Sequence, residues 1–223
     1  MARGFSMVEL LIVLTVITIL TGISLFYLSG HQTLYRPDEQ ALKIIDFLQE
    51  ARQRSLTQRE TMRVEIDSTA GIVRLIDENE PNTAADDAEV RMTVLLPNAE
   101  VRMKERPPDV AVNPPETMSV PIAQFKASSY PLSNGHEVCT FRFARNGTVV
   151  NEGNDDIGTN AVPTGVTLFI WSPKKNDPSR SEIARAITVI GASGSVRYWE
   201  YDRNSTATNK WKDSRRSGVY GGS

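Results

Sequence analysis

The hydrophobic pattern of the chain begins with one long apolar run. No charged residue occurs between Leu10 and Leu28, where Leu, Ile and Val predominate. About 20 such residues in a helix cross the hydrocarbon layer of a bilayer, so residues 10–28 are predicted to span a membrane. Met1-Ala2-Arg3-Gly4 precedes the run, and no Ala-x-Ala cleavage site follows it. The positive charge of Arg3 predicts a cytoplasmic N-terminus and an extracytoplasmic location for everything after Leu28.

A second helical pattern follows the apolar run. Pro37, with Asp38 and Glu39 after it, is typical of a first helical turn, so a kink or restart is expected near Tyr35 to Asp38. Small and apolar residues then recur at spacings of three and four: Ala41, Leu42, Ile45, Leu48, Ala51, Arg52 and Ser55. The two segments together predict a long kinked helix of more than about 50 residues, roughly 80 Å in length.

Alternation of apolar and polar residues predicts antiparallel strands downstream. Thr61–Asp67 and Ile72–Ile76 flank a turn and predict a hairpin. Asn146-Gly147 is a strong hairpin signal between Val138–Ala144 and Thr148–Val150. Asn146-Gly147-Thr148 also matches a glycosylation acceptor, but the turn is the preferred interpretation. Further strands are predicted at Val90–Leu96, Ala99–Met103, Val166–Trp171, Ala186–Ile190 and Ser195–Tyr201.

Three segments and the C-terminus are predicted to be irregular. Asp77–Glu89 is polar and acidic, repeated prolines make 106–121 an exposed excursion, and Pro173–Ser181 is a charged loop. Beyond Asp202 the chain is polar and rich in Gly and Ser, which predicts a mobile tail. The expected fold is α+β: a long kinked N-terminal helix, transmembrane in its first half, packs through residues 29–60 on an antiparallel β-sheet head at 61–201, and the tail is 202–223.

Composition removes several classes of function. The chain has 25 Lys plus Arg against 27 Asp plus Glu, a net charge of −2, so no overall field attracts nucleic acid. Cys139 is the only cysteine, so neither an intrachain disulfide nor a cysteine-based zinc site is expected, and a buried thiol is predicted. His31 and His136 are the only histidines and are interpreted as ordinary surface or core residues. No cofactor or metal is expected.

Catalysis is not expected either. The sequence offers no set of nucleophile, base and orienting group, and no phosphate-binding Gly-rich loop. Asp86-Asp87 and Asp155-Asp156 are candidate paired acids or calcium ligands, although acidic pairs in polar loops are more often simply solvated. We therefore expect a protein that is not an enzyme.

Glu9 is the anomaly of the apolar segment, because an unpaired carboxylate is costly there and by default marks a function. The surrounding residues are Gly4-Phe5-Ser6-Met7-Val8-Glu9-Leu10-Leu11-Ile12-Val13-Leu14, which closely resemble the type IV prepilin processing motif. The resemblance implies that a membrane peptidase cuts between Gly4 and Phe5 and N-methylates Phe5. Residues 1–4 are then a leader and 5–28 a transmembrane and assembly helix.

The same resemblance implies a role for Glu9. The new amine at Phe5 of one subunit would pair with Glu9 of a neighbour and set the assembly register. The alternative is an interfacial carboxylate in an ordinary single-span anchor. The implied partners are the prepilin peptidase, other pilin or pseudopilin subunits, and the membrane through 10–28. The implied location is the bacterial inner membrane, with a cytoplasmic N-terminus, a periplasmic head and incorporation into a filament after processing.

The head resembles one subgroup, the GspH/FimT minor pseudopilins. The resemblance rests on Gln49–Ser55 with Arg59, on the run Phe141–Gly147, and on Ala186–Arg197. It implies a minor pseudopilin, a structural subunit of a type II secretion pseudopilus. The alternative is a minor type IV pilin for pilus assembly or DNA uptake. For DNA uptake, candidate contacts lie in a basic tail, where Trp211 would stack on a base: Lys210, Trp211, Lys212, Arg215 and Arg216. A solvated tail is the preferred interpretation.

Overall fold

The computed structural model describes residues 6–78, 87–116, 125–151 and 160–213, without the side chains of residues 25–34. Residues 1–35 and 36–223 form two units, which are considered separately. One helix, α1 (Met7–Gln58), belongs to both and includes Pro37. The predicted restart near Tyr35 to Asp38 is therefore wrong, since the helix continues past a residue that lacks a backbone donor. The kink stays a prediction.

The second unit begins with the part of α1 that packs against the strands. Its buried face comprises Ala41, Ile44, Ile45, Phe47, Leu48, Ala51 and Ser55. The predicted stripe is confirmed except at Leu42, whose side chain is 58% exposed, and at Arg52, which is only half-buried. Helical geometry explains both results, because residues three and four apart share a face and Leu42 lies beside that face.

Six strands form the first sheet, sheet A: β1 (Thr61–Asp67), β2 (Ile72–Glu78), β3 (Ala88–Val94), β4 (Lys126–Ala127), β5 (Glu137–Phe143) and β6 (Val149–Val150). The path through it is β3-β2-β1-β5-β4, with β6 also paired to β5, and all pairings are antiparallel. A short 3-10 helix, Pro131–Ser133, precedes β5. The predicted hairpins at Ser68–Gly71 and Asn146-Gly147 are both confirmed.

Four strands form sheet B: β7 (Val166–Lys174), β8 (Asp177–Ile190), β9 (Ser195–Tyr201) and β10 (Trp211–Asp213). They pair antiparallel in the order β10-β9-β8-β7. The predicted loop at Pro173–Ser181 is wrong, because β7 and β8 continue to a pairing of Lys174 with Asp177. Register shifts on both sides of Pro173 accommodate its missing donor, as is usual for proline in an edge strand.

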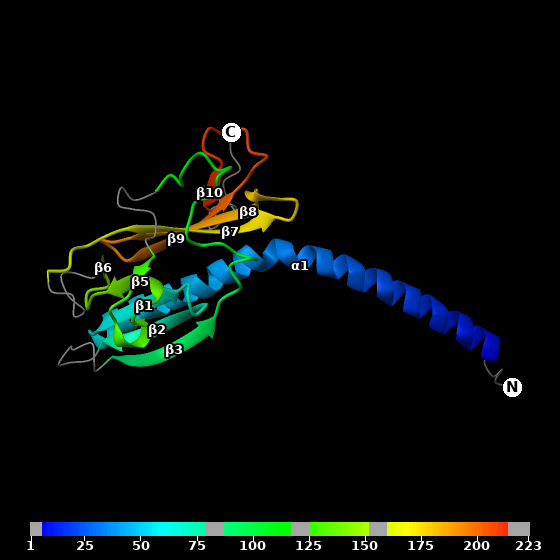
Figure 1. Ribbon diagram of the computed structural model, residues 1–223, viewed down its shortest axis with the longest axis horizontal. Coiled ribbons are helices and arrows are strands. Elements are labelled where there is room, and N and C mark those ends of the chain that lie inside the picture. Colours follow the sequence, from blue (N-terminus) through cyan, green and yellow to red (C-terminus); the bar gives the residue numbers. More distant parts are fainter. Residues whose placement is uncertain (1–5, 79–86, 117–124, 152–159, 214–223) are drawn as a thin grey trace. The chain divides into compact units, whose positions relative to one another are not determined.

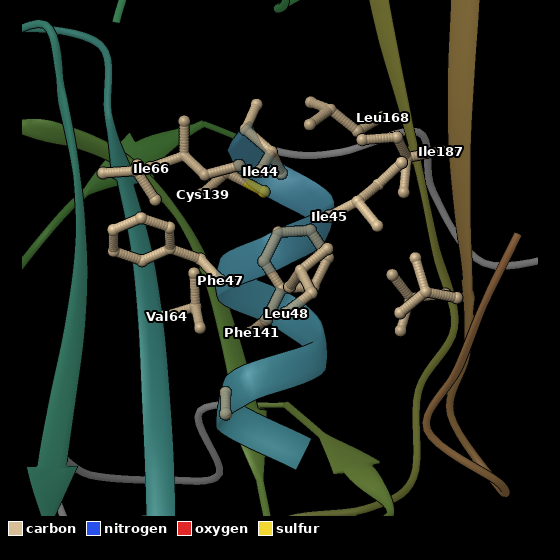
Figure 2. Close-up of a cluster of buried hydrophobic side chains, with 14 of the residues drawn as sticks. Ile44, Ile45, Phe47, Leu48, Val64, Ile66, Cys139, Phe141, Leu168 and Ile187 are labelled. Carbon is tan, nitrogen blue, oxygen red and sulfur yellow. The ribbon is translucent and has the colours of Figure 1, made fainter. Parts of the chain in front are cut away.

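The main core lies between the two sheets, with the second half of α1 inside it (Figure 1). Figure 2 shows Phe47 beside Val64 and Ile66 of sheet A, whereas Ile45 points towards Leu168 and Ile187 of sheet B. Cys139 lies in this core, which confirms the predicted buried thiol. Burial of each large apolar side chain contributes about 1.5–3 kcal/mol, so the helix segment serves as the central layer of the head.

The opposite face of sheet A carries a cluster of buried charges. Arg63 is fully buried and pairs with Glu65 at 2.8 Å, Glu78 at 2.6 Å and Asp87 at 2.6 Å. The ring of Tyr130 covers its guanidinium at 3.6 Å. Burial alone would lower the pKa of Arg63, but the three carboxylates raise it above its ordinary value. The polar residues of β1 are therefore enclosed by a second layer and are not solvated.

A second, smaller core lies on the outer face of sheet B. Its buried members are Val110, Phe169, Trp171, Ala184, Ala186, Trp199 and Trp211. The indole of Trp171 donates to the carbonyl of Glu105 at 2.8 Å. Asp109 accepts hydrogen bonds from Ser181, from its backbone amide and from its hydroxyl, each at 3.0 Å. The excursion predicted to be exposed is thus partly packed over the part described, residues 106–116. Pro107, Val110 and Pro114 are buried, whereas the exposed residues are Pro108, Ala111, Val112, Pro115 and Glu116.

Two further strand predictions are corrected. Ala99–Met103 forms no strand but a turn, followed by a single backbone bridge from Arg102 to Trp171. The strand predicted at Val90–Leu96 is β3, which begins and ends two residues earlier. The predicted irregular segment Asp77–Glu89 is shorter than expected, because β2 extends to Glu78 and β3 begins at Ala88. The pairing ends at Val94, and the amide of Leu96 instead donates to the side-chain oxygen of Gln40 at 2.7 Å.

Candidate functional site

The N-terminal unit presents an apolar surface. Met7–Ser24 has a mean hydropathy of 2.3 and is long and apolar enough to cross a membrane. Its three threonine hydroxyls are satisfied internally: those of Thr15, Thr18 and Thr21 each donate at 2.8 Å to the carbonyl four residues earlier. Such satisfaction is what an apolar solvent requires, because an unpaired polar group there costs several kcal/mol. The segment therefore suits insertion into lipid or into a bundle of similar helices.

Glu9 is the acidic residue of the first turn of α1 and is exposed. Helix dipoles place partial positive charge at that end, which favours a carboxylate there. Among the residues that the structure describes, no side chain pairs with Glu9. Gly4 and Phe5, the predicted processing residues, and the side chain of His31 lie outside the described part. The site as described is one carboxylate at the start of an otherwise apolar helix, available to a group from another molecule.

The C-terminal segment differs from the predicted mobile tail. Trp211–Asp213 pairs with β9, and Trp211 is only 4% exposed. Its indole donates to the carbonyl of Val112 at 2.7 Å, and its ring lies 5.2 Å from that of Tyr201. Trp211 is thus buried in the head with its indole N–H already bonded, so in this structure its ring is not exposed for the predicted stacking on a nucleic-acid base.

The two lysines of this segment also have partners. Lys210 donates to the carbonyl of Arg203 at 3.0 Å, and Lys212 pairs with Asp202 at 2.5 Å. Hydrogen bonding to Lys212 lowers the pKa of Asp202 below its ordinary value. Arg215 and Arg216 lie outside the described residues. What the structure describes of this segment is a closing strand of the head.

Asp87 and His136, two of the candidate acids and histidines, bind other residues of the head. Asp87 binds Arg63, while Asp86, Asp155 and Asp156 lie outside the described residues. His136 approaches Asp67 at 2.7 Å through Nδ1, and Asp67 also accepts hydrogen bonds from two amides of the β1–β2 turn. Within the four described ranges, no group of three or more His, Cys, Asp or Glu residues could hold a metal ion.

Sequence reasoning missed two clusters of charge. Arg63 and Glu65 were recognised only as the polar positions of an alternating strand, although alternate charges of opposite sign on paired strands are a signal of cross-strand pairing. The second is a clamp on α1: Asp38 accepts a hydrogen bond from Tyr198 at 2.5 Å and binds Arg185 through both oxygens. Proline followed by an acid was recognised as a helix start, but nothing local indicated the partners 147 and 160 residues away.

The comparisons agree with the N-terminal geometry. A helix able to span a membrane, with one exposed carboxylate in its first turn and a two-sheet α+β head, is an arrangement suited to an anchored filament subunit. Residues 1–25 match the prokaryotic N-terminal methylation motif. No significant match was found among curated proteins or among solved structures. The motif supports a type IV prepilin-like protein, a structural class processed by prepilin peptidase and assembled with other pilin subunits.

Proposed function

We propose that the chain is a minor pseudopilin, a structural subunit of a type II secretion pseudopilus. The observation that carries this proposal is the methylation motif at residues 1–25, joined to an exposed apolar helix with Glu9 in its first turn. In this proposal the N-terminus is cytoplasmic, the apolar segment lies in the bacterial inner membrane, and the head is periplasmic until the subunit enters a filament.

The head supports the minor-subunit assignment. Its surface carries the Pro-rich segment over residues 106–116 and the long β7–β8 hairpin. Such additions would crowd the repeated surface of a filament built from one subunit, whereas a rare subunit tolerates them. The resemblance to the GspH/FimT group supports the same assignment through the strand Ala186–Ile190, its Gly191–Gly194 turn and Arg197.

Processing is the first test. The full chain is expressed with and without a prepilin peptidase, and its intact mass is measured before N-terminal sequencing. We expect loss of Met1 to Gly4 and one added methyl group on Phe5. An unchanged N-terminus in the presence of active peptidase, or a cut beyond Leu28, would refute the proposal and leave an ordinary membrane anchor or a secreted head.

Assembly is tested at Glu9. Glu9→Ala removes the only charge of the apolar segment, so the amine of a neighbouring subunit loses its partner and incorporation into sheared filaments should fall by about tenfold or more. Glu9→Asp keeps the charge and should retain much more incorporation. Processing should continue in both variants. Equal incorporation of wild type and Glu9→Ala would contradict the pairing role.

A minor type IV pilin is the second candidate, because the N-terminal motif supports both classes of filament. Deletion of the gene in its host distinguishes them: loss of exoprotein secretion with normal pili supports the pseudopilin, and loss of pili or DNA uptake with normal secretion supports the pilin. For DNA uptake, Arg215→Ala with Arg216→Ala should reduce DNA retention, and unchanged retention excludes a role for these two arginines.

A further inference from the structure

A polar groove lies between the end of α1 and the start of β9. It has a volume of about 580 Å³ and is open to solvent. Side chains one helical turn apart on α1 form one wall and β9 forms the other, and the polar lining comprises Gln49, Arg52, Gln53, Thr57, Ser195 and Arg197. None of these residues takes part in processing or in the pairing proposed for Glu9. The groove is therefore separate from the N-terminal assembly site.

Arg52 is held in the groove by the backbone of the β8–β9 turn. Its Nε donates to the carbonyl of Ser193 at 3.1 Å. The turn closes tightly here, since a Cβ on Gly194 would lie 3.1 Å from this Nε and 2.0 Å from the carbonyl oxygen of Gly147. Gly194 has a φ of +62°, which also favours glycine. The two terminal nitrogens of Arg52 bond to none of the described residues, so a preoriented guanidinium still has donors to offer.

Arg197 supplies the second guanidinium. Its Nε is buried and lies 3.4 Å from Glu116, but it forms no hydrogen bond with a described residue, and its Nη1 is 3.9 Å from Asp213. These separations give electrostatic attraction without good hydrogen-bond geometry. A buried donor in this state gains free energy from a better acceptor. Two arginines thus face one groove with incompletely used donors.

We propose that this groove binds a carboxylate side chain carried by an extended acidic segment of another protein subunit. Guanidinium forks match carboxylates through paired N–H donors. The amides of Gln49 and Gln53 provide donors and acceptors for a peptide backbone, and Leu56, which is 43% exposed, provides apolar contact. The proposal deepens the proposed function and rests on it, because neighbouring filament subunits would supply the segment.

A protein partner fits better than a nucleic acid. Tight binding of a phosphate polymer requires many cations, since each neutralised phosphate adds to affinity. Here the groove offers two arginines, of which Arg197 already lies near Glu116 and Asp213, in a chain whose net charge is −2. That arrangement suits one or two carboxylates rather than a continuous polyanion.

The test is anisotropy of a fluorescein-labelled hexaglutamate peptide added to the purified full chain in detergent micelles. Arg52→Gln with Arg197→Gln should weaken binding by about tenfold or more, the usual effect of losing charge-assisted hydrogen bonds. Because Arg52 and Arg197 also bind other parts of the head, their replacement could affect folding, and a second pair of variants changes only the surface residue Gln53. Gln53→Glu should weaken binding and Gln53→Lys should strengthen it, each by roughly fivefold at low salt. Lys175→Gln, the same loss of charge on the distant β7–β8 turn, should leave affinity unchanged.

Three results would overturn the inference: equal affinity for wild type and both Gln53 variants, equal weakening by Lys175→Gln, or displacement of the peptide by oligothymidylate at concentrations below those of unlabelled hexaglutamate. The last would make the groove a phosphate site. The outcome is distinguishable from failure of the proposed function, because peptide binding does not require cleavage after Gly4. If the chain is not cleaved by an active prepilin peptidase but still binds the peptide, the pseudopilin proposal is refuted and the peptide-binding role of the groove is supported.

Discussion

Replacement of Arg63 by methionine tests whether the covered face of sheet A is held by a buried ion cluster. The side chain of Arg63 is fully buried, as are those of Glu65 and, within a few per cent, Glu78. Methionine preserves most of the volume but removes the cation that Glu65, Glu78 and Asp87 share, and of these only Glu78 keeps a close arginine partner, Arg142 at 2.6 Å. Breaking a buried pair in this way costs about 3–5 kcal/mol. Urea unfolding of the full chain in micelles, followed by tryptophan fluorescence, measures the change.

Arg91→Met is the matched control. Arg91 also binds two carboxylates, Asp46 at 2.8 Å and Glu50 at 2.6 Å, and also lies over an aromatic ring, 4.5 Å from the centre of Phe47. Its side chain is 43% exposed, however, and exposed pairs contribute up to about 1 kcal/mol. We therefore expect a loss several times smaller than for Arg63→Met. Equal losses in the two variants would refute the assignment of the effect to burial.

The pH dependence of the free energy of unfolding provides a second test of the same substitution. Burial raises the pKa of Glu78 above its ordinary value of 4.5 even though Arg63 and Arg142 lower it. Removal of Arg63 should raise this pKa further. When the pKa of a carboxyl group is higher in the folded protein than in the unfolded chain, its protonation stabilises the folded state. This contribution to the free energy of unfolding is fully present below the pKa of the unfolded chain and is lost as the pH rises through the pKa of the folded protein. The deficit of Arg63→Met should thus be largest near pH 7 and shrink towards pH 5, whereas a constant deficit would contradict the carboxylate mechanism.

Three further changes have distinct expected effects on urea unfolding. Trp211→Ala should destabilise the head by about 3–5 kcal/mol, because it empties a buried site beneath the Pro-rich segment. Gly194→Ala should cost about 2–4 kcal/mol, since its Cβ would meet the carbonyl of Gly147, whereas Gly71→Ala, with a φ of +68° but open space, should cost about 1 kcal/mol. Asp38→Asn removes the charge that its arginine and tyrosine partners bind, and should cost about 2–3 kcal/mol. The reasoning would be refuted for each variant by an unchanged free energy of unfolding: for Trp211→Ala this would indicate a mobile C-terminal strand, for Gly194→Ala an unstrained turn, and for Asp38→Asn a solvated carboxylate.

Local patterns predicted the first part of the head well. Thr61–Asp67 is a strand because its alternation lasts seven residues and a turn follows at once. The N-terminal helix was equally predictable, since an uncharged run of this length has few alternatives. Glu9 could be found for the same reason, as a charge in an apolar run is visible without any structure.

The remaining features depend on contacts between distant segments. Arg63 alternates with apolar neighbours as a solvent-facing residue does, but residues from other segments, including Asp87 and the more distant Tyr130, enclose it. The polar composition after Asp202 concealed a closing strand, because the stabilising contacts of Trp211 come from the Pro-rich segment about 100 residues earlier. Those segments order each other, and neither carries a local signal of order.

The closing strand has a consequence for the order of synthesis. The paired strands of sheet A and the second half of α1 are all complete once Val150 has been made. The outer cluster on sheet B, by contrast, cannot be covered until Asp213 has emerged, ten residues from the end of the chain. Until then Phe169 lacks the ring of Trp211, whose centre lies 6.0 Å from its own. A released chain that ends near residue 202 would therefore contain every residue of the main core but would carry an uncovered aromatic surface, the kind of surface that chaperones and proteases recognise.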